Sequence, residues 1–162
     1  MTLRAPASKV LSVETLLEKH GRPREHSVVF TNGVFDLMHR GHTTYLAAAR
    51  ALGDVLVVGV NSDASARRQG KGPGRPIIEE FDRVELLAAL EAVDVVCLFD
   101  DDTPSTLVEA LLPDVLVKGG DYNLDAVIGR TAVEGAGGRV DLIGFVDGYS
   151  SGDLIQRIRE TD

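Results

Sequence analysis

Two histidines stand three positions apart in the run His39-Arg40-Gly41-His42. Residues 43–52, which follow, are rich in Ala and Leu, so we expect a helix to begin here. The start of a helix has free backbone N–H groups and a partial positive charge, both of which favour an anion. Gly41 would let a ligand approach the backbone, and two imidazoles could donate hydrogen bonds to phosphate oxygens. The pattern therefore predicts a phosphate-binding site.

Two other interpretations of the histidine pair have to be weighed. A metal site is one, but no third Cys or His lies nearby, and two histidines alone make a poor transition-metal site. We therefore expect no protein-held metal. The other is a pair of structural histidines, which would be the default for isolated residues.

Four basic residues gather within nine positions of an otherwise acidic chain, whose net charge is −8. They are Arg67, Arg68, Lys71 and Arg75, in a segment rich in Gly and Pro. A solvated mobile loop is the plain interpretation. Because the segment follows an apolar strand, we expect instead that residues 66–75 form a mobile flap that binds an anion.

A second helix start lies near the end of the chain. Ser150 and Ser151 precede a helical pattern over residues 151–159 and could supply a capping hydroxyl and free N–H groups. Opposite the first helix start, this one could close around a single ligand. Asp121, in the run Lys118-Gly-Gly-Asp, could accept a hydrogen bond from a sugar hydroxyl or a base, or could simply cap a turn.

The elements that must position these residues alternate along the chain. Unbroken apolar runs are typical of strands buried on both faces of a parallel sheet. They alternate with helical patterns, which predicts a Rossmann-like, doubly wound α/β domain of about five parallel strands with helices on both faces. Such sheets bind ligands outside the carboxyl ends of their strands. The expected strands are residues 27–31, 54–60, 93–99, 115–117 and 139–143, and the expected helices are 43–52, 79–92, 103–112, 131–136 and 151–159.

Residues 1–26 are predicted to be a helical extension, and residues 27–162 the main domain. Composition narrows the classes of function. The acidic balance argues against a nucleic-acid partner. The chain has no apolar stretch of membrane-spanning length, and residues 1–7 lack the apolar core of a signal peptide. Its single cysteine, Cys97, lies in an apolar run and indicates a buried thiol in a reducing compartment. We expect a cytoplasmic protein.

The histidines belong to a longer pattern, Gly33-x-Phe35-Asp36-x-x-His39-x-Gly41-His42. This pattern resembles the signature of the cytidylyltransferase-like nucleotidyltransferases, and the resemblance extends over residues 27–159. It implies that the segment around Gly33 and the histidines hold a nucleoside triphosphate, that Lys71 contacts its phosphates, and that the late serine segment grips them. By this resemblance the catalytic residues are His39, His42 and Lys71; the nucleotide-binding residues are Thr31, Asn32, Gly33, Val34, Phe35, Gly41, Asp147, Gly148, Tyr149, Ser150 and Ser151; and the substrate-binding residues are Asn61, Arg75, Lys118 and Asp121.

Within this group the chain is most similar to the D-glycero-β-D-manno-heptose 1-phosphate adenylyltransferases, in their stand-alone form. The likeness lies in the runs Asn61-Ser-Asp-Ala-Ser, Gly74-Arg-Pro-Ile and Leu112-Pro-Asp-Val-Leu-Val-Lys-Gly-Gly. Where the glycerol-phosphate cytidylyltransferases carry Arg-Thr-Glu-Gly, this chain has Phe145-Val-Asp-Gly, which favours the heptose type. Gly152 replaces a Thr expected after the two serines.

The resemblance implies transfer of AMP from ATP to heptose 1-phosphate, with release of pyrophosphate. A sugar phosphate is largely dianionic at neutral pH, so no general base is needed. Mg²⁺ is expected to arrive on the ATP. A cytidylyltransferase acting on a polyol or amino-alcohol phosphate and a non-catalytic nucleotide-binding regulator remain alternatives, and a homo-oligomer is possible.

Overall fold

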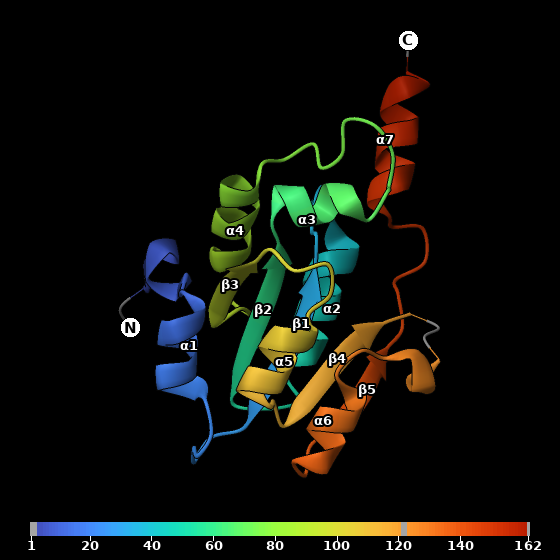
Figure 1. Cartoon of the computed structure of the whole chain (residues 1–162). Helices are drawn as coiled ribbons and strands as arrows, with labels where there is room; N and C mark the ends of the chain where they lie inside the picture. The colour runs from blue at the N-terminus through green and yellow to red at the C-terminus, as the bar shows by residue number, and fades with distance from the viewer. Residues whose placement is uncertain (1–2, 121–122, 162) are drawn as a thin grey trace.

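A single sheet of five parallel strands forms the centre of the protein (Figure 1). The computed structural model describes residues 3–120 and 123–161, so Asp121 lies outside the described residues. The strands lie in the order β3-β2-β1-β4-β5. They are β1 (Val28–Gly33), β2 (Val55–Asn61), β3 (Val95–Phe99), β4 (Val115–Gly119) and β5 (Arg139–Ile143). The predicted fold class is therefore confirmed.

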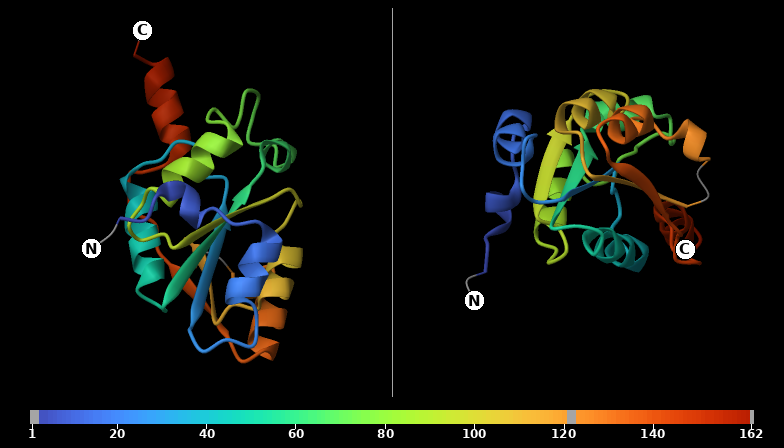
Figure 2. Two further views of the ribbon diagram at one scale, coloured as in Figure 1. Left: turned by 90° about the vertical axis from the view of Figure 1, so that its left-hand side faces the viewer. Right: turned by 90° about the horizontal axis from the view of Figure 1, so that it is seen from below.

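The apolar runs form strands because both faces of the sheet are covered. In the central strand β1, Val28, Val29 and Phe30 are all fully buried although successive side chains point to opposite faces. The helices α2 (Arg40–Arg50) and α4 (Glu80–Ala88) pack on the face that carries Val29. A second layer of helices covers the opposite face of the sheet (Figure 2). That layer, on the face carrying Val28 and Phe30, consists of α1 (Val13–His20), α5 (Ser105–Leu111) and α6 (Arg130–Gly135).

The N-terminal residues are joined to this sheet. Leu16 of α1 is fully buried in the same core as Phe30. Ser12 caps α1 by accepting the N–H of Thr15 at 3.2 Å. Ahead of α1, a short 3₁₀ turn, η1 (Pro6–Lys9), leads to a parallel bridge between Val10 and β3.

The strand order creates the crevice in which a ligand can lie. β1 pairs with β2 on one side and with β4 on the other, so the chain leaves the middle of the sheet in opposite directions. At this switch point the loops beyond the carboxyl ends diverge. The loop after β1 leads to the histidines, and the last helix, α7 (Ser151–Arg159), rises from the same end of the sheet (Figure 1).

The segment after β2 differs from the sequence prediction. Residues 63–68 form a helix, α3 (Asp63–Arg68), so Arg67 and Arg68 belong to its last turn and not to a loop. Ser62 starts this helix by accepting the N–H of Ser65 at 3.0 Å. The Gly- and Pro-rich run that follows hid this short helix from the sequence pattern. We therefore call residues 69–78, which follow α3, the basic loop.

A 3₁₀ turn, η2 (Leu124–Ala126), precedes α6. Helix α2 begins at Arg40, three residues earlier than predicted, because His39 already takes the N-cap position. Among the described residues, no helix combines the length and apolarity that crossing a bilayer requires.

Candidate active site

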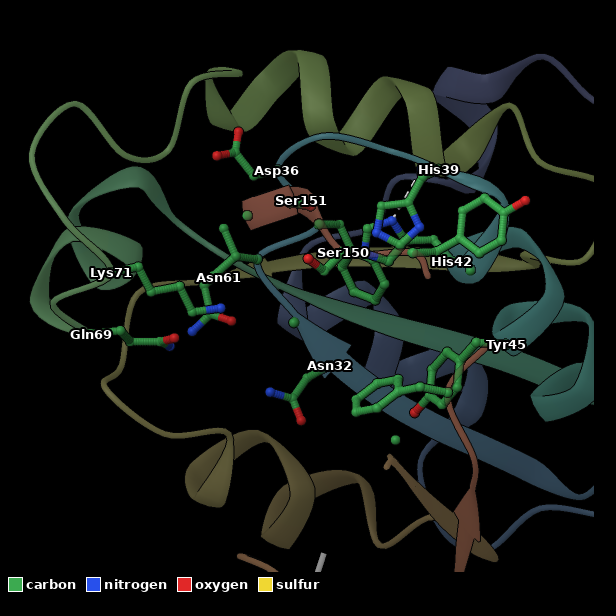
Figure 3. Close-up of a pocket in the computed structure, with 18 of the residues that line it drawn as sticks. Asn32, Asp36, His39, His42, Tyr45, Asn61, Gln69, Lys71, Ser150 and Ser151 are labelled. Atoms are coloured by element: carbon green, nitrogen blue, oxygen red, sulfur yellow. Dashed lines mark hydrogen bonds between the residues drawn. The ribbon is translucent and has the colours of Figure 1, made fainter. Parts of the chain in front are cut away.

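A cavity of about 900 Å³ opens at the carboxyl ends of β1, β2 and β4. Its walls come from segments far apart in the sequence: the loop between β1 and α2, the loop after α3, and the start of α7 (Figure 3). Residues that line it include Asn32, Phe35, His39, His42, Asn61, Lys71, Arg75, Lys118, Ser150 and Ser151.

The two histidines form a stacked pair at the start of α2. Their ring centroids lie 3.9 Å apart and the planes differ by 25°. The backbone N–H of His39 donates to Nδ1 of His42 at 3.3 Å, shown as a dashed line in Figure 3. This bond assigns the tautomer: neutral His42 carries its proton on Nε2 and can donate there.

Both histidines are held neutral. Burial, followed by the nearby His39 and Lys71, lowers the pKa of His42 to about 4. Burial also lowers the pKa of His39. At neutral pH the pair therefore provides uncharged hydrogen-bond donors. Nδ1 of His39 is buried and has no hydrogen-bond partner within the described residues.

Gly41 allows the pair to stack against its surroundings. A Cβ atom at this position would lie 2.8 Å from Cε1 of His39 and 3.1 Å from Cβ of Tyr149. The first distance is too short for two carbon atoms and the second is tight, so a side chain here would displace His39 and press on the segment before α7. The glycine in the histidine motif is needed for this close packing.

Phe35 closes the inner side of the pair. Its ring centroid lies 5.4 Å from that of His42. The backbone at Phe35 has φ of 52°, a left-handed conformation that costs energy for a bulky residue. A Cβ on Gly33 would lie 3.0 Å from the Phe35 ring. The ring can therefore take its position beside His42 only because residue 33 has no side chain.

Asp36 fastens the loop between β1 and α2 to the far end of the basic loop. Its carboxylate accepts hydrogen bonds from the N–H groups of Ile77 (2.8 Å) and Ile78 (2.9 Å) and from Nε of Arg75 (2.7 Å). Burial opposes ionisation of Asp36, but these donors outweigh it and lower its pKa. The geometry therefore gives Asp36 the role of orienting the loop that carries the motif.

The start of α7 packs beside the histidine pair, where the ring of Tyr149 stacks on that of His39 with centroids 6.1 Å apart. Ser150 caps the helix by accepting the N–H of Asp153 at 3.0 Å. Ser151 donates to the carbonyl of Leu37 at 3.0 Å and so ties α7 to the loop that carries His39. The two predicted helix starts therefore lie next to each other at one cavity (Figure 3), and not opposite each other as the sequence suggested.

Strand ends supply the floor. Asn61, at the end of β2, donates from Nδ2 to Oγ of Ser65 at 3.0 Å, and its Oδ1 is buried without a partner in the described residues. Lys118, at the end of β4, donates to Oδ1 of Asn32. Burial lowers the pKa of Lys118 to about 8. A partly desolvated ammonium group beside a cavity is suited to a phosphate group.

Almost all the site residues expected from the sequence lie at this cavity. The exception is Thr31, which is fully buried in β1 and hydrogen-bonded to Tyr45 at 2.7 Å, so its side chain does not reach the cavity. Asp121 lies outside the described residues. The sequence reading missed Tyr45, which is three positions after His42 and so shares its helix face. It also missed Gln69, Thr103, Ile128, Phe145, Val146 and Asp153, which line the cavity from loops and the start of α7.

The comparison with known families agrees with this arrangement. The model of the family described as cytidylyltransferase-like matches residues 30–157, which include the histidine pair and the start of α7. This chain belongs to the cytidylyltransferase-like family. It is a nucleotidyltransferase.

Individual relatives narrow the comparison. The Bifunctional protein HldE of Citrifermentans bemidjiense is 56% identical over 155 residues, which is 93% of this chain and 31% of that protein. HldE of Trichlorobacter lovleyi is 54% identical over 155 residues, again 31% of its length. The chain thus spans about a third of these relatives. The crystal structure of the lipopolysaccharide core biosynthesis protein from Thermoplasma volcanium has a TM-score of 0.63 and 32% identity, covering 78% of this chain and all of that one.

Proposed function

We propose that the protein transfers AMP from ATP to heptose 1-phosphate, giving ADP-heptose and pyrophosphate for surface-glycan synthesis. The observation that carries the proposal is the neutral histidine pair at the start of α2, which lines one cavity together with the adjoining start of α7. The substrate class comes from the sequence resemblance to heptose 1-phosphate adenylyltransferases and from the lipopolysaccharide core biosynthesis protein among the structural relatives.

The reaction is an in-line displacement. A phosphate oxygen of the sugar phosphate attacks the α-phosphorus of ATP, and the bond between that phosphorus and the bridging oxygen to the β-phosphate breaks. The bridging oxygen leaves with the electron pair as part of pyrophosphate. Because the attacking phosphate is already anionic, the protein has to position the groups and stabilise charge rather than remove a proton.

The described residues match that requirement. Nε2–H of His42 and the free N–H groups at the start of α2 can donate to phosphate oxygens while adding no full charge. Lys71, on the basic loop, supplies positive charge, whereas the charge of Arg75 is already paired with Asp36. Lys118 and Asn32 lie at the end of β4 and β1, where they can hold the second phosphate-bearing substrate.

Mg²⁺ bound to the triphosphate would neutralise part of the charge on the leaving group. The carboxylate of Asp36 is engaged by the basic loop, whereas those of Asp147 and Asp153 line the cavity and have no partner among the described residues. Asp147 and Asp153 are therefore the residues that could add an oxygen ligand to Mg²⁺ carried in by ATP. This arrangement fits a metal held mainly by the nucleotide.

A panel assay tests the proposal. Pyrophosphate release is measured with ATP or CTP against heptose 1-phosphate, glycerol phosphate and other sugar or polyol phosphates. The combination of ATP, heptose 1-phosphate and Mg²⁺ should give the highest kcat/KM, with CTP much poorer. A preference for CTP and glycerol phosphate would overturn the heptose assignment and leave the family intact.

A further inference from the structure

Arg83 has the largest side chain that the fold buries completely among the described residues. All three guanidinium nitrogens are used. Nε donates to the carbonyl of Ile78 at 2.9 Å, Nη1 to the carbonyl of Val34 at 2.5 Å, and Nη2 to Asp63 at 2.8 Å. Arg83 therefore joins three segments around the cavity: the loop before the histidines, the start of α3, and the end of the basic loop. Because it is fully buried, it cannot touch a substrate.

Arg83 and Asp36 hold the same residue from two sides. Asp36 accepts the N–H of Ile78, and Arg83 donates to the carbonyl of Ile78. Asp36 also holds Arg75, three residues earlier. The end of the basic loop is thus fixed to the loop that carries the nucleotidyltransferase motif, by a carboxylate and a guanidinium that are both out of contact with bulk water.

The beginning of the loop is also tied down. Arg68, the last residue of α3, is paired with Asp102 and donates to the carbonyl of Asp100. Residues 69–74 lie between the two fixed ends. Gly70 and Gly74 have positive φ, and a side chain at either position would meet nothing within 4 Å. The part of the loop that is free to move therefore contains Lys71, and its reach depends on where the ends are held.

We propose that Arg83 is a positioning residue for the transfer reaction, acting through Lys71. By fixing the end of the loop at Ile78, it sets the place from which Lys71 reaches the nucleotide phosphates. The inference rests on the proposed role of Lys71 in nucleotide binding. A purely structural ion pair would also stabilise the fold. In that case, however, the effect of removing it on nucleotide binding would be the same whether residue 71 is a lysine or an alanine.

That dependence is the test. The dissociation constant of Mg-ATP, or of Mg-CTP if that is the nucleotide bound, is measured for the wild type, Lys71→Ala, Arg83→Lys and the double variant. Each single change should weaken binding about 10- to 100-fold, the range for one charge-assisted hydrogen bond. If Arg83 acts through Lys71 alone, as proposed, the double variant should bind no more weakly than Lys71→Ala.

The chain offers a matched control in Arg24. Its side chain is also buried and bonds to the carbonyls of Leu111 and Leu112 and to Asp114, but at the opposite end of the sheet. Arg24→Lys should lower the melting temperature and leave the dissociation constant within about twofold, with or without Lys71. Asp36→Asn loosens the same loop end from its other side and replaces Arg83→Lys if that variant does not fold.

The outcomes separate the inference from the proposed reaction. If the two substitutions weaken nucleotide binding independently, so that their fold-changes multiply in the double variant, the inference about Arg83 is overturned. It is also overturned if Lys71→Ala binds nucleotide as tightly as the wild type. A protein that binds ATP but forms no ADP-heptose would contradict the proposed reaction, while the binding cycle would still decide the role of Arg83.

Discussion

The histidine pair is built so that neither ring carries a charge near neutral pH. Stacking at 3.9 Å and burial both penalise a proton, and the bond from the backbone of His39 fixes the donor atom of His42. A neutral donor that is already oriented can stabilise charge as it develops on the phosphates without reorganising. The chemistry of the site depends on this arrangement more than on the basicity of either ring.

Removing either imidazole should therefore lower turnover with little effect on folding. We expect His39→Ala and His42→Ala each to lower kcat by about 10²-fold or more, the scale for losing one preorganised donor. Steady-state kinetics and the melting temperature are measured together. Activity within a few-fold of wild type in a folded variant would reduce the histidines to structural residues.

The low pKa of His42 also predicts how stability depends on pH. In the unfolded chain this histidine titrates near its ordinary value of 6.5, whereas in the folded protein it titrates at about 4. Between these values the unfolded state binds the extra proton, so the free energy of unfolding must fall as pH falls from 6.5 to 4. His42→Gln should show a shallower fall over this range in denaturant titrations. Equal slopes in the two proteins would show that His42 is not held neutral.

At the residue scale, the sequence predicted that the histidines, the serines and the two lysines belong to the site, and all of them line the cavity. They could be singled out because motifs and helix starts have recognisable residue types. It could not show that Thr31 turns inward to bond Tyr45. Nor could it reveal Arg83, whose three partners come from separate segments. Contacts of this kind depend on how distant parts of the chain pack.

Among the elements, α2 depends on the absence of a side chain at its second residue. Gly41→Ala should lower kcat/KM about tenfold or more, since the added methyl group would displace His39 from its stacked position. Gly135→Ala in α6 is the matched control, because a Cβ there meets nothing within 4 Å. Kinetics of both variants check the prediction. Equal activities would mean that the placement of His39 does not limit the reaction.

The basic loop should respond to nucleotide. Residues 69–74 lie beside α7 and include three glycines with positive φ. Because such a glycine-rich segment opens easily, we expect fast amide exchange there in the free protein. Mg-ATP should slow exchange in this loop while leaving residues 75–78, which Asp36 and Arg83 hold, nearly unchanged. Exchange measured by mass spectrometry with and without nucleotide tests this. Equal protection in both states would show that the loop is a fixed element.

The elements themselves were largely predictable, because unbroken apolar runs flanked by helical patterns specify buried parallel strands. The helix α3 was not. Its six residues are too short for an apolar period, and they run into a Gly- and Pro-rich segment that is typical of a loop. As a result, the sequence pattern places Arg67 and Arg68 in the flap, whereas in the structure they belong to the end of a helix.

For the whole molecule, function follows from the order of the strands. Only the reversal between β1 and β4 brings the ends of β1, β2 and β4, the histidine helix and α7 to one cavity. Alternation of strands and helices indicated such a crevice, and the family match confirms the class of enzyme. The choice of nucleotide and sugar depends on contacts at the cavity wall and has to be measured.

The most direct test uses heptose 1-phosphate whose non-bridging phosphate oxygens carry ¹⁸O, incubated with ATP, Mg²⁺ and the protein. Products are analysed by mass spectrometry. If the sugar phosphate attacks the α-phosphorus, all of the label appears in ADP-heptose and none in pyrophosphate. Label in pyrophosphate, or the formation of ADP without ADP-heptose, would contradict AMP transfer at this site.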